Sequence, residues 1–129
     1  MRVIYDTNVL ATIFSSRSEL IELKQQVASG KFQLITSPFI VKELEATLIA
    51  KFRATRQLAK TRTRLLVRVA IMVQPTVIVP VVRDPNDDHI IAAAVAGKAD
   101  YIVTLDKDLL VLKKHKDIHI VKPSELMSQ

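Results

Sequence analysis

The chain has no cysteine and only two glycines among its 129 residues. Without cysteine there are no disulfide bonds, no zinc-thiolate cluster and no thiol nucleophile, and a reducing cytoplasm is compatible with this composition. Two glycines are too few for the glycine-rich loop of a P-loop or Rossmann nucleotide site. Aromatic residues make up 5% of the chain, so base stacking is a poor prospect, and the sequence does not indicate which nucleotides would be preferred.

Long hydrophobic runs are also missing. The longest apolar stretch, Ile90 to Ala96, is far too short to cross a bilayer. The charged residues Arg2 and Asp6 interrupt the N-terminal segment, so it does not have the uncharged apolar core of a signal peptide. We therefore expect a soluble, cytoplasmic protein with no membrane contact. With 49% hydrophobic residues, the chain is expected to fold as a single domain over residues 1–129 with a sizeable core.

Positive charge predominates, with a formal net charge of +6. This balance favours a polyanionic partner such as RNA, although an acidic protein or an anionic membrane surface would be attracted equally. Five basic residues recur at steps of three or four, which predicts a basic stripe on one helix, opposite Leu58, Leu65, Leu66 and Val69. The stripe consists of Arg53, Arg56, Lys60, Arg64 and Arg68. Contact with the RNA backbone and a merely solvated helix surface are the two interpretations.

Short β-branched or aromatic segments alternate with helical patterns. The predicted buried strands are Val3 to Tyr5, Phe32 to Ile35, Val77 to Val79, Tyr101 to Leu105 and Ile118 to Val121. Helices predicted over Ser18 to Ser29 and Asp87 to Ala96 end at the two glycines, where helix C-caps favour glycine. This alternation predicts an α/β fold with a central parallel sheet between helical layers. Ligands of such folds gather at the carboxyl ends of the strands.

Four acids lie far apart in the sequence, each beside a predicted strand or helix: Asp6, Glu43, Asp88 and Asp106. Carboxylate oxygens are the ligands that Mg²⁺ and Mn²⁺ prefer, and crowded carboxylates repel one another unless a cation or protons compensate. Taken singly, each acid has a structural alternative. Asp6 and one of the Asp87-Asp88 pair are good helix N-caps, Asp106 and Asp108 suit a turn, and Glu45 is as well placed as Glu43.

Together these segments resemble the ordered motifs of the PIN domain. The resemblance rests on DTNVL at Asp6, SPFIVKEL ending at Glu43-Leu44, DDHIIAAA at Asp88 and VTLDKDLL at Asp106. It implies a strand order of 3-2-1-4-5 and Mg²⁺- or Mn²⁺-dependent hydrolysis of RNA that leaves 5′-phosphate and 3′-hydroxyl ends. The resemblance also implies roles for individual residues. The catalytic, metal-binding acids would be Asp6, Glu43, Asp88 and Asp106, and the supporting polar residues would be Asn8, Thr104, Asp108 and Asp87. A one-residue misalignment would exchange Asp87 with Asp88.

The VVRDPNDD segment is most similar to the branch of the family related to VapC toxins of toxin-antitoxin pairs. That similarity implies a small antitoxin partner, whose acidic tail is a further candidate occupant of the basic stripe, and it leaves a homodimer open. Two rival interpretations remain. A phosphorelay receiver domain also places acids at strand ends, but Thr36 and Ser37 stand where its phospho-accepting aspartate should be. The other rival is a catalytically inactive binding protein on the same fold.

Overall fold

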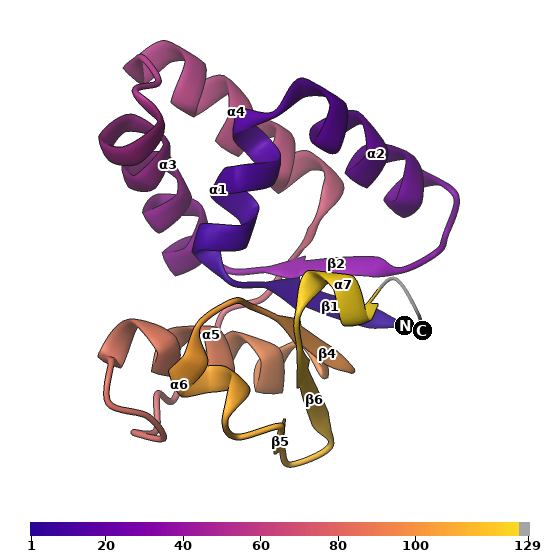
Figure 1. Ribbon diagram of the computed structural model, residues 1–129, viewed down its shortest axis with the longest axis vertical. Coiled ribbons are helices and arrows are strands. Elements are labelled where there is room, and N and C mark those ends of the chain that lie inside the picture. Colours follow the sequence, from indigo (N-terminus) through magenta and orange to yellow (C-terminus); the bar gives the residue numbers. More distant parts are fainter. Residues whose placement is uncertain (127–129) are drawn as a thin grey trace.

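The computed structural model describes residues 1–126, and its centre is a six-stranded sheet (Figure 1). The strands are β1 (Arg2–Tyr5), β2 (Gln33–Thr36), β3 (Ile71–Met72), β4 (Tyr101–Val103), β5 (Lys114–His115) and β6 (Ile118–Val121). Their order is β3-β2-β1-β4-β6-β5, and every neighbouring pair is parallel except β5 with β6. The predicted α/β class and the order of the parallel strands are confirmed, and the antiparallel edge strand β5 is an addition.

Helices cover both faces of this sheet. They are α1 (Thr7–Ser15), α2 (Arg17–Ala28), α3 (Pro38–Phe52), α4 (Arg56–Val69), α5 (Pro85–Ala96), α6 (Lys107–Leu110) and α7 (Pro123–Leu126). Figure 1 shows α1 to α4 on one side of the sheet and α5 with α6 on the other. Within residues 1–126, no helix combines the length and apolar character needed to cross a bilayer.

The central strands are buried on both faces, which explains their nearly continuous apolar sequences. Ile4 of β1 is paired with Ile35 of β2 and Ile102 of β4, and all of these side chains are at most 1% exposed. Helix α5 lies very close to this layer at its C-terminal end. A Cβ atom on Gly97 would lie 2.6 Å from Ile35 Cγ2, so glycine allows this approach.

The third strand was predicted at the wrong residues. The strand beside β2 is Ile71–Met72, directly after α4, where Ile71 is paired with Ile35. Val77 to Val79, the predicted strand, lies in the connection to α5, and Val77 is 68% exposed. The position next to β2 is filled as soon as the chain leaves α4, so the later β-branched run has no place in the sheet.

The basic stripe also departs from its prediction, because the segment that carries it forms two helices. Helix α3 ends before Arg53, which adopts a left-handed conformation with φ 57°, and α4 begins at Arg56 with the Thr55 hydroxyl capping its N-terminus. Leu58, expected on the buried side, is 44% exposed, whereas Leu66 is fully buried. The four basic residues Arg56, Lys60, Arg64 and Arg68 are nevertheless exposed along α4.

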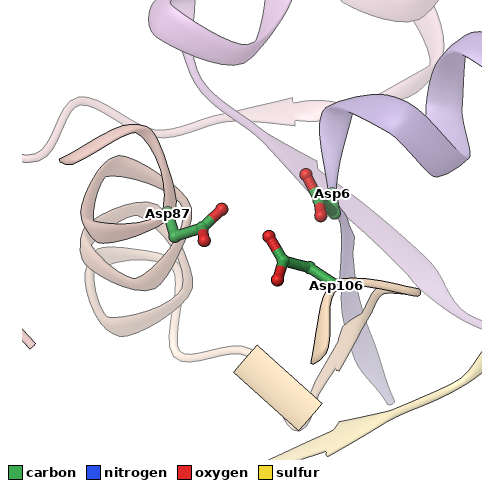
Figure 2. A group of neighbouring side chains, drawn as sticks. All are labelled: Asp6, Asp87 and Asp106. Carbon is green, nitrogen blue, oxygen red and sulfur yellow. The ribbon is translucent and has the colours of Figure 1, made fainter. Parts of the chain in front are cut away.

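The parallel topology brings distant parts of the chain to one edge of the sheet. Asp6 follows β1, and the segment from Thr104 to Asp106 follows β4, which is the neighbour of β1. The backbone amide of Asp6 donates to the carbonyl of Val103 at 2.9 Å, so the two strand ends are joined directly. The N-terminus of α5 reaches the same edge, as Figure 2 shows.

Candidate metal centre

Three carboxylates from three separate segments meet at this edge. Asp6, Asp87 and Asp106 each offer one oxygen, and these oxygens all lie within 4.8 Å of one another. Figure 2 shows the three side chains pointing toward a common point from the end of β1, the first turn of α5 and the start of α6. We call this group the acidic cluster.

Asp6 is a buried acid held in place by a neighbouring hydroxyl. Its Oδ2 accepts a hydrogen bond of 2.7 Å from Thr104 Oγ1, and both residues are buried. Burial raises the pKa of Asp6, and the hydrogen bond from Thr104 partly offsets this effect. Thr104 also accepts a 3.0 Å hydrogen bond from the backbone amide of Asp106. One hydroxyl therefore contacts the carboxylate of Asp6 and the backbone of Asp106.

Asp87 is the most perturbed acid of the cluster. It is 5% exposed, and its Oδ2 is buried without a hydrogen-bond partner in residues 1–126. Its pKa is raised to about 7, first by burial, then by a hydrogen bond with Asp106 and by the negative charges of Asp106, Asp6 and Asp84. When this carboxylate is ionised, its buried negative charge is not neutralised by a nearby group, and either a proton or a cation would neutralise it.

Asp88 takes a different role from the one expected of it. Its Oδ1 accepts hydrogen bonds from the backbone amides of Val81 at 2.7 Å and Val82 at 3.1 Å, so its carboxylate anchors the loop before α5. Consecutive helical residues point about 100° apart, and only one of the two neighbouring acids can face the strand ends. Asp88 was expected in the metal site with Asp87 in support, whereas Asp87 is the member of the acidic cluster.

Helix capping accounts for only part of the acidic residues near the site. Asp84 caps α5 by accepting from the backbone amide of Asn86 at 2.9 Å. Asp106 is the N-cap of α6 and accepts from the amide of Asp108 at 2.8 Å while also belonging to the acidic cluster. Capping and membership of the cluster therefore coexist at Asp106.

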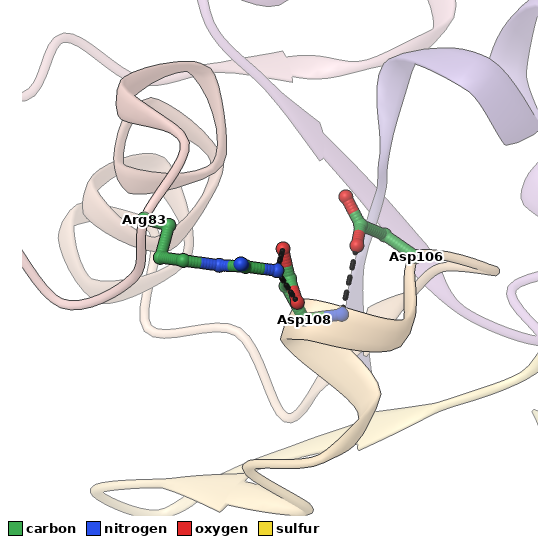
Figure 3. A network of polar contacts seen from close by, with 3 residues as sticks. All are labelled: Arg83, Asp106 and Asp108. Carbon is green, nitrogen blue, oxygen red and sulfur yellow. Dashed lines mark hydrogen bonds and ion pairs between the residues drawn. The ribbon is translucent and has the colours of Figure 1, made fainter.

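Asp108 lies beside the acidic cluster and is paired with a cation. Its carboxylate oxygens contact Arg83 Nη2 at 2.9 and 3.0 Å (Figure 3). Arg83 belongs to the loop before α5, so this ion pair links the approaches to α5 and α6. The sequence patterns did not predict a role for Arg83. The feature that could have indicated one is its position directly before Asp84, the N-cap of α5.

The remaining expected site residues lie outside the acidic cluster. Glu43 is half-buried on α3 and is not part of the group of three found in residues 1–126. Asn8 is exposed in the first turn of α1, where its Oδ1 accepts from Lys51 Nζ at 3.4 Å. Sequence geometry left Glu43 and Glu45 equivalent, and both are half-buried.

The acidic cluster has the chemical features of a site for a hard divalent cation. It offers oxygen donors of the kind that Mg²⁺ and Mn²⁺ bind. The unpartnered Oδ2 of Asp87 and the raised pKa values of Asp6 and Asp87 show that the metal-free arrangement leaves negative charge poorly compensated. The residues present therefore fit a metal ion.

Comparisons with known proteins agree with this architecture. A family model described as a PIN domain matches residues 2–108. Among solved structures, that of VapBC2 from Rickettsia felis bound to a DNA fragment from their promoter is similar, with a TM-score of 0.63 and 12% sequence identity. This match covers 93% of this chain and 97% of that chain, and at such low identity it shows the fold alone. No curated protein sequence matches.

Proposed function

The chain belongs to the PIN-domain family, and from this premise we propose that it is a Mg²⁺- or Mn²⁺-dependent endoribonuclease. The observation that carries the proposal is the acidic cluster, in which Asp6, Asp87 and Asp106 converge and a buried Asp87 oxygen lacks a partner. Family membership also removes the receiver-domain alternative. A receiver has the strand order 2-1-3-4-5, whereas this sheet runs β3-β2-β1-β4-β6-β5.

The proposed roles follow from the contacts of each side chain. Asp6, Asp87 and Asp106 would hold the cation, and Thr104 orients Asp6 and Asp106 through its hydroxyl. A bound Mg²⁺ or Mn²⁺ supplies Lewis acidity to the phosphodiester and makes water a stronger nucleophile. Asp88 holds the loop before α5 through two backbone amides, which fixes the approach to the helix that carries Asp87.

Glu43 remains in the proposed catalytic set as an outer member. It is half-buried on α3, the helix that follows β2, and β2 is the neighbour of β1 in the sheet. The carboxyl end of β2 therefore shares the edge that carries Asp6. We propose that Glu43 acts from this helix as a further acid of the site, outside the three acids that converge.

The basic residues of α4 are the proposed RNA-binding surface. Arg56, Lys60, Arg64 and Arg68 are exposed at intervals of four residues, and Arg53 is exposed at the break between α3 and α4. Together with the net charge of +6, they would attract the RNA backbone. Contacts of this kind do not read base sequence.

We further propose that the nuclease is the toxin of a toxin-antitoxin pair. The similarity of fold to VapBC2 supports this role. A small antitoxin would be the protein partner. An acidic tail on such a partner would compete with RNA for the basic residues of α4, because both are polyanions.

Cleavage of single-stranded RNA tests the proposed activity. The parent protein should cleave with Mg²⁺ or Mn²⁺ and stop when EDTA is added. Asp6→Asn should lose at least about 100-fold in rate, because it removes a charged ligand from the proposed metal site. Circular dichroism and thermal unfolding check that the variant is folded. Cleavage by Asp6→Asn at the parent rate would contradict the proposed site, and a folded parent that binds RNA without cleaving it would identify an inactive binding domain.

A further inference from the structure

The ion pair between Arg83 and Asp108 lies at the surface beside the acidic cluster. The side chain of Arg83 is 86% exposed, and that of Asp108 is 38% exposed. An ion pair this exposed contributes little to folding stability, because solvent screens it and ordering two side chains costs entropy. Its position is more informative than its strength, since Asp108 lies two residues after Asp106 of the acidic cluster.

The guanidinium group uses only one of its nitrogens in this pair. Arg83 Nη2 contacts both oxygens of Asp108, at 2.9 and 3.0 Å. Nε and Nη1 of Arg83 make no hydrogen bond to any of residues 1–126. Both two-donor edges of a guanidinium include Nη2, which is paired with Asp108, so Nε–H and the N–H groups of Nη1 remain available as separate donors. Each of these N–H groups can donate a charge-assisted hydrogen bond to a phosphate oxygen.

The location of Arg83 places these free donors beside the proposed reaction site. Arg83 immediately precedes Asp84, the N-cap of the helix that carries Asp87. Its partner Asp108 donates its backbone amide to Asp106 Oδ1 at 2.8 Å, so the ion pair is joined to the acidic cluster by a direct hydrogen bond (Figure 3). An open cavity of about 500 Å³, lined by Arg83, Asp108, Val111 and the segment from Pro80 to Val82, borders the pair.

We propose that Arg83 binds a phosphate of the RNA strand next to the one that is cleaved, and that Asp108 positions its guanidinium for this contact. The inference rests on the proposed nuclease function, because it concerns the same substrate. Asp108 holds Nη2, and Nε or Nη1 would donate to the phosphate. Arg83 is thus a substrate-binding residue, and Asp108 is its positioning residue.

RNA binding over a series of salt concentrations tests the role of Arg83. The probe is a single-stranded RNA oligonucleotide, with EDTA present to prevent cleavage. Arg83→Gln should weaken binding roughly tenfold, because a charge-assisted contact is lost. It should also reduce the slope of log K against log salt by about 0.7, the value for one contact on a single strand. Arg83→Lys should keep the slope and recover binding only in part, because an ammonium group on a flexible stem lacks the fixed set of donors with which a guanidinium contacts Asp108 and a phosphate together.

The matched control is Arg17→Gln, which removes the same charge from an exposed arginine. Arg17 begins α2, beyond the far end of α1, whose nine residues rise about 13 Å from the acidic cluster. Binding and salt slope in this variant should remain close to those of the parent. Equal effects of Arg83→Gln and Arg17→Gln, in a parent that binds and cleaves RNA, would overturn the role of Arg83. A parent that neither binds nor cleaves RNA would instead refute the proposed function.

A double-mutant cycle tests the positioning role of Asp108. If Asp108 orients the guanidinium, Arg83→Gln should weaken RNA binding less in the Asp108→Asn background than in the parent. An ion pair without a functional role would give no such coupling in RNA binding. A larger effect of Arg83→Gln in the Asp108→Asn background would show that Asp108 competes with RNA for Arg83, and an equal effect would show independence. Either result overturns the positioning role.

Discussion

At the scale of single residues, neighbouring acids in this chain have separate tasks that depend on their direction. Asp87 faces the acidic cluster, and Asp88 accepts backbone hydrogen bonds from the loop before α5. The sequence predicts that an acid at this point of α5 belongs to the site. It does not decide between the two, because both positions suit the start of a helix and a one-residue error turns the side chain by about 100°.

The raised pKa of Asp87 predicts how the stability of the metal-free protein depends on pH. In the folded protein this pKa is about 7, whereas an unperturbed aspartate titrates near 3.8. The protonated acid therefore contributes stability that is fully present below pH 4 and is lost as the pH rises through 7. The shift of Asp6 has the same sign. Thermal unfolding in EDTA should give a higher Tm at pH 5 than at pH 8, and this difference in Tm should be larger in the parent than in Asp87→Asn.

Two variants isolate the contribution of Asp87 from other titrating groups. Asp87→Asn should make the difference in Tm between pH 5 and pH 8 smaller by roughly 3–5 °C, which corresponds to about 1 kcal/mol for a domain of this size. Asp117→Asn, at an exposed position between β5 and β6, should leave the parent difference unchanged. A parent and an Asp87→Asn variant with the same pH dependence would show that Asp87 is not destabilised by its surroundings.

At the scale of helices and strands, the sequence predicts the central strands better than the interruptions between helices or the edge of the sheet. The central strands are recognisable because both their faces are buried and their residues are almost all apolar, as in Val3, Ile4 and Tyr5. The break between α3 and α4 was missed, because Arg53 and Thr55 carry no glycine or proline signal. The break depends on a left-handed residue and a hydroxyl cap instead. Which β-branched segment joins β2 depends on the path of the chain after α4.

The exposed basic residues of α4 yield a prediction about RNA binding. Replacing Arg56, Lys60 and Arg64 together by glutamine should weaken RNA binding and reduce its salt slope by about 0.7 for each lost phosphate contact. Cleavage at saturating RNA should persist, because these residues lie outside the acidic cluster. The measurement is fluorescence anisotropy with a labelled single-stranded RNA at several salt concentrations.

The same triple variant distinguishes two partners for this surface. A variant that binds RNA normally but no longer binds an antitoxin encoded beside the gene would show that α4 is a protein-docking surface. If neither RNA binding nor antitoxin binding changed, these residues would be a solvated helix surface without an assigned role. A triple substitution of Lys113, Lys114 and Lys116 by glutamine, which removes equal charge near β5, is the matched control.

At the scale of the whole molecule, the topology creates the site. Adjacent parallel strands β1 and β4 end side by side, so Asp6 and Asp106 meet although 100 residues separate them in the sequence. Helix α5, on the face of the sheet opposite α1, then brings Asp87 to the same edge. The alternation of strands and helices predicts this edge as the site, whereas the exact members of the acidic cluster depend on helix rotation, which the sequence pattern leaves open.

Comparing Asp87→Asn with Asp88→Asn in Mg²⁺-dependent RNA cleavage is the most direct test of the acidic cluster. Both variants remove one negative charge from adjacent buried positions of the same helix. Asparagine at position 88 still accepts hydrogen bonds from the amides of Val81 and Val82 through its carbonyl oxygen. We expect Asp87→Asn to lose at least about 100-fold in rate and Asp88→Asn to stay within about tenfold of the parent. An inactive Asp88→Asn beside an active Asp87→Asn would contradict the assignment of the metal site.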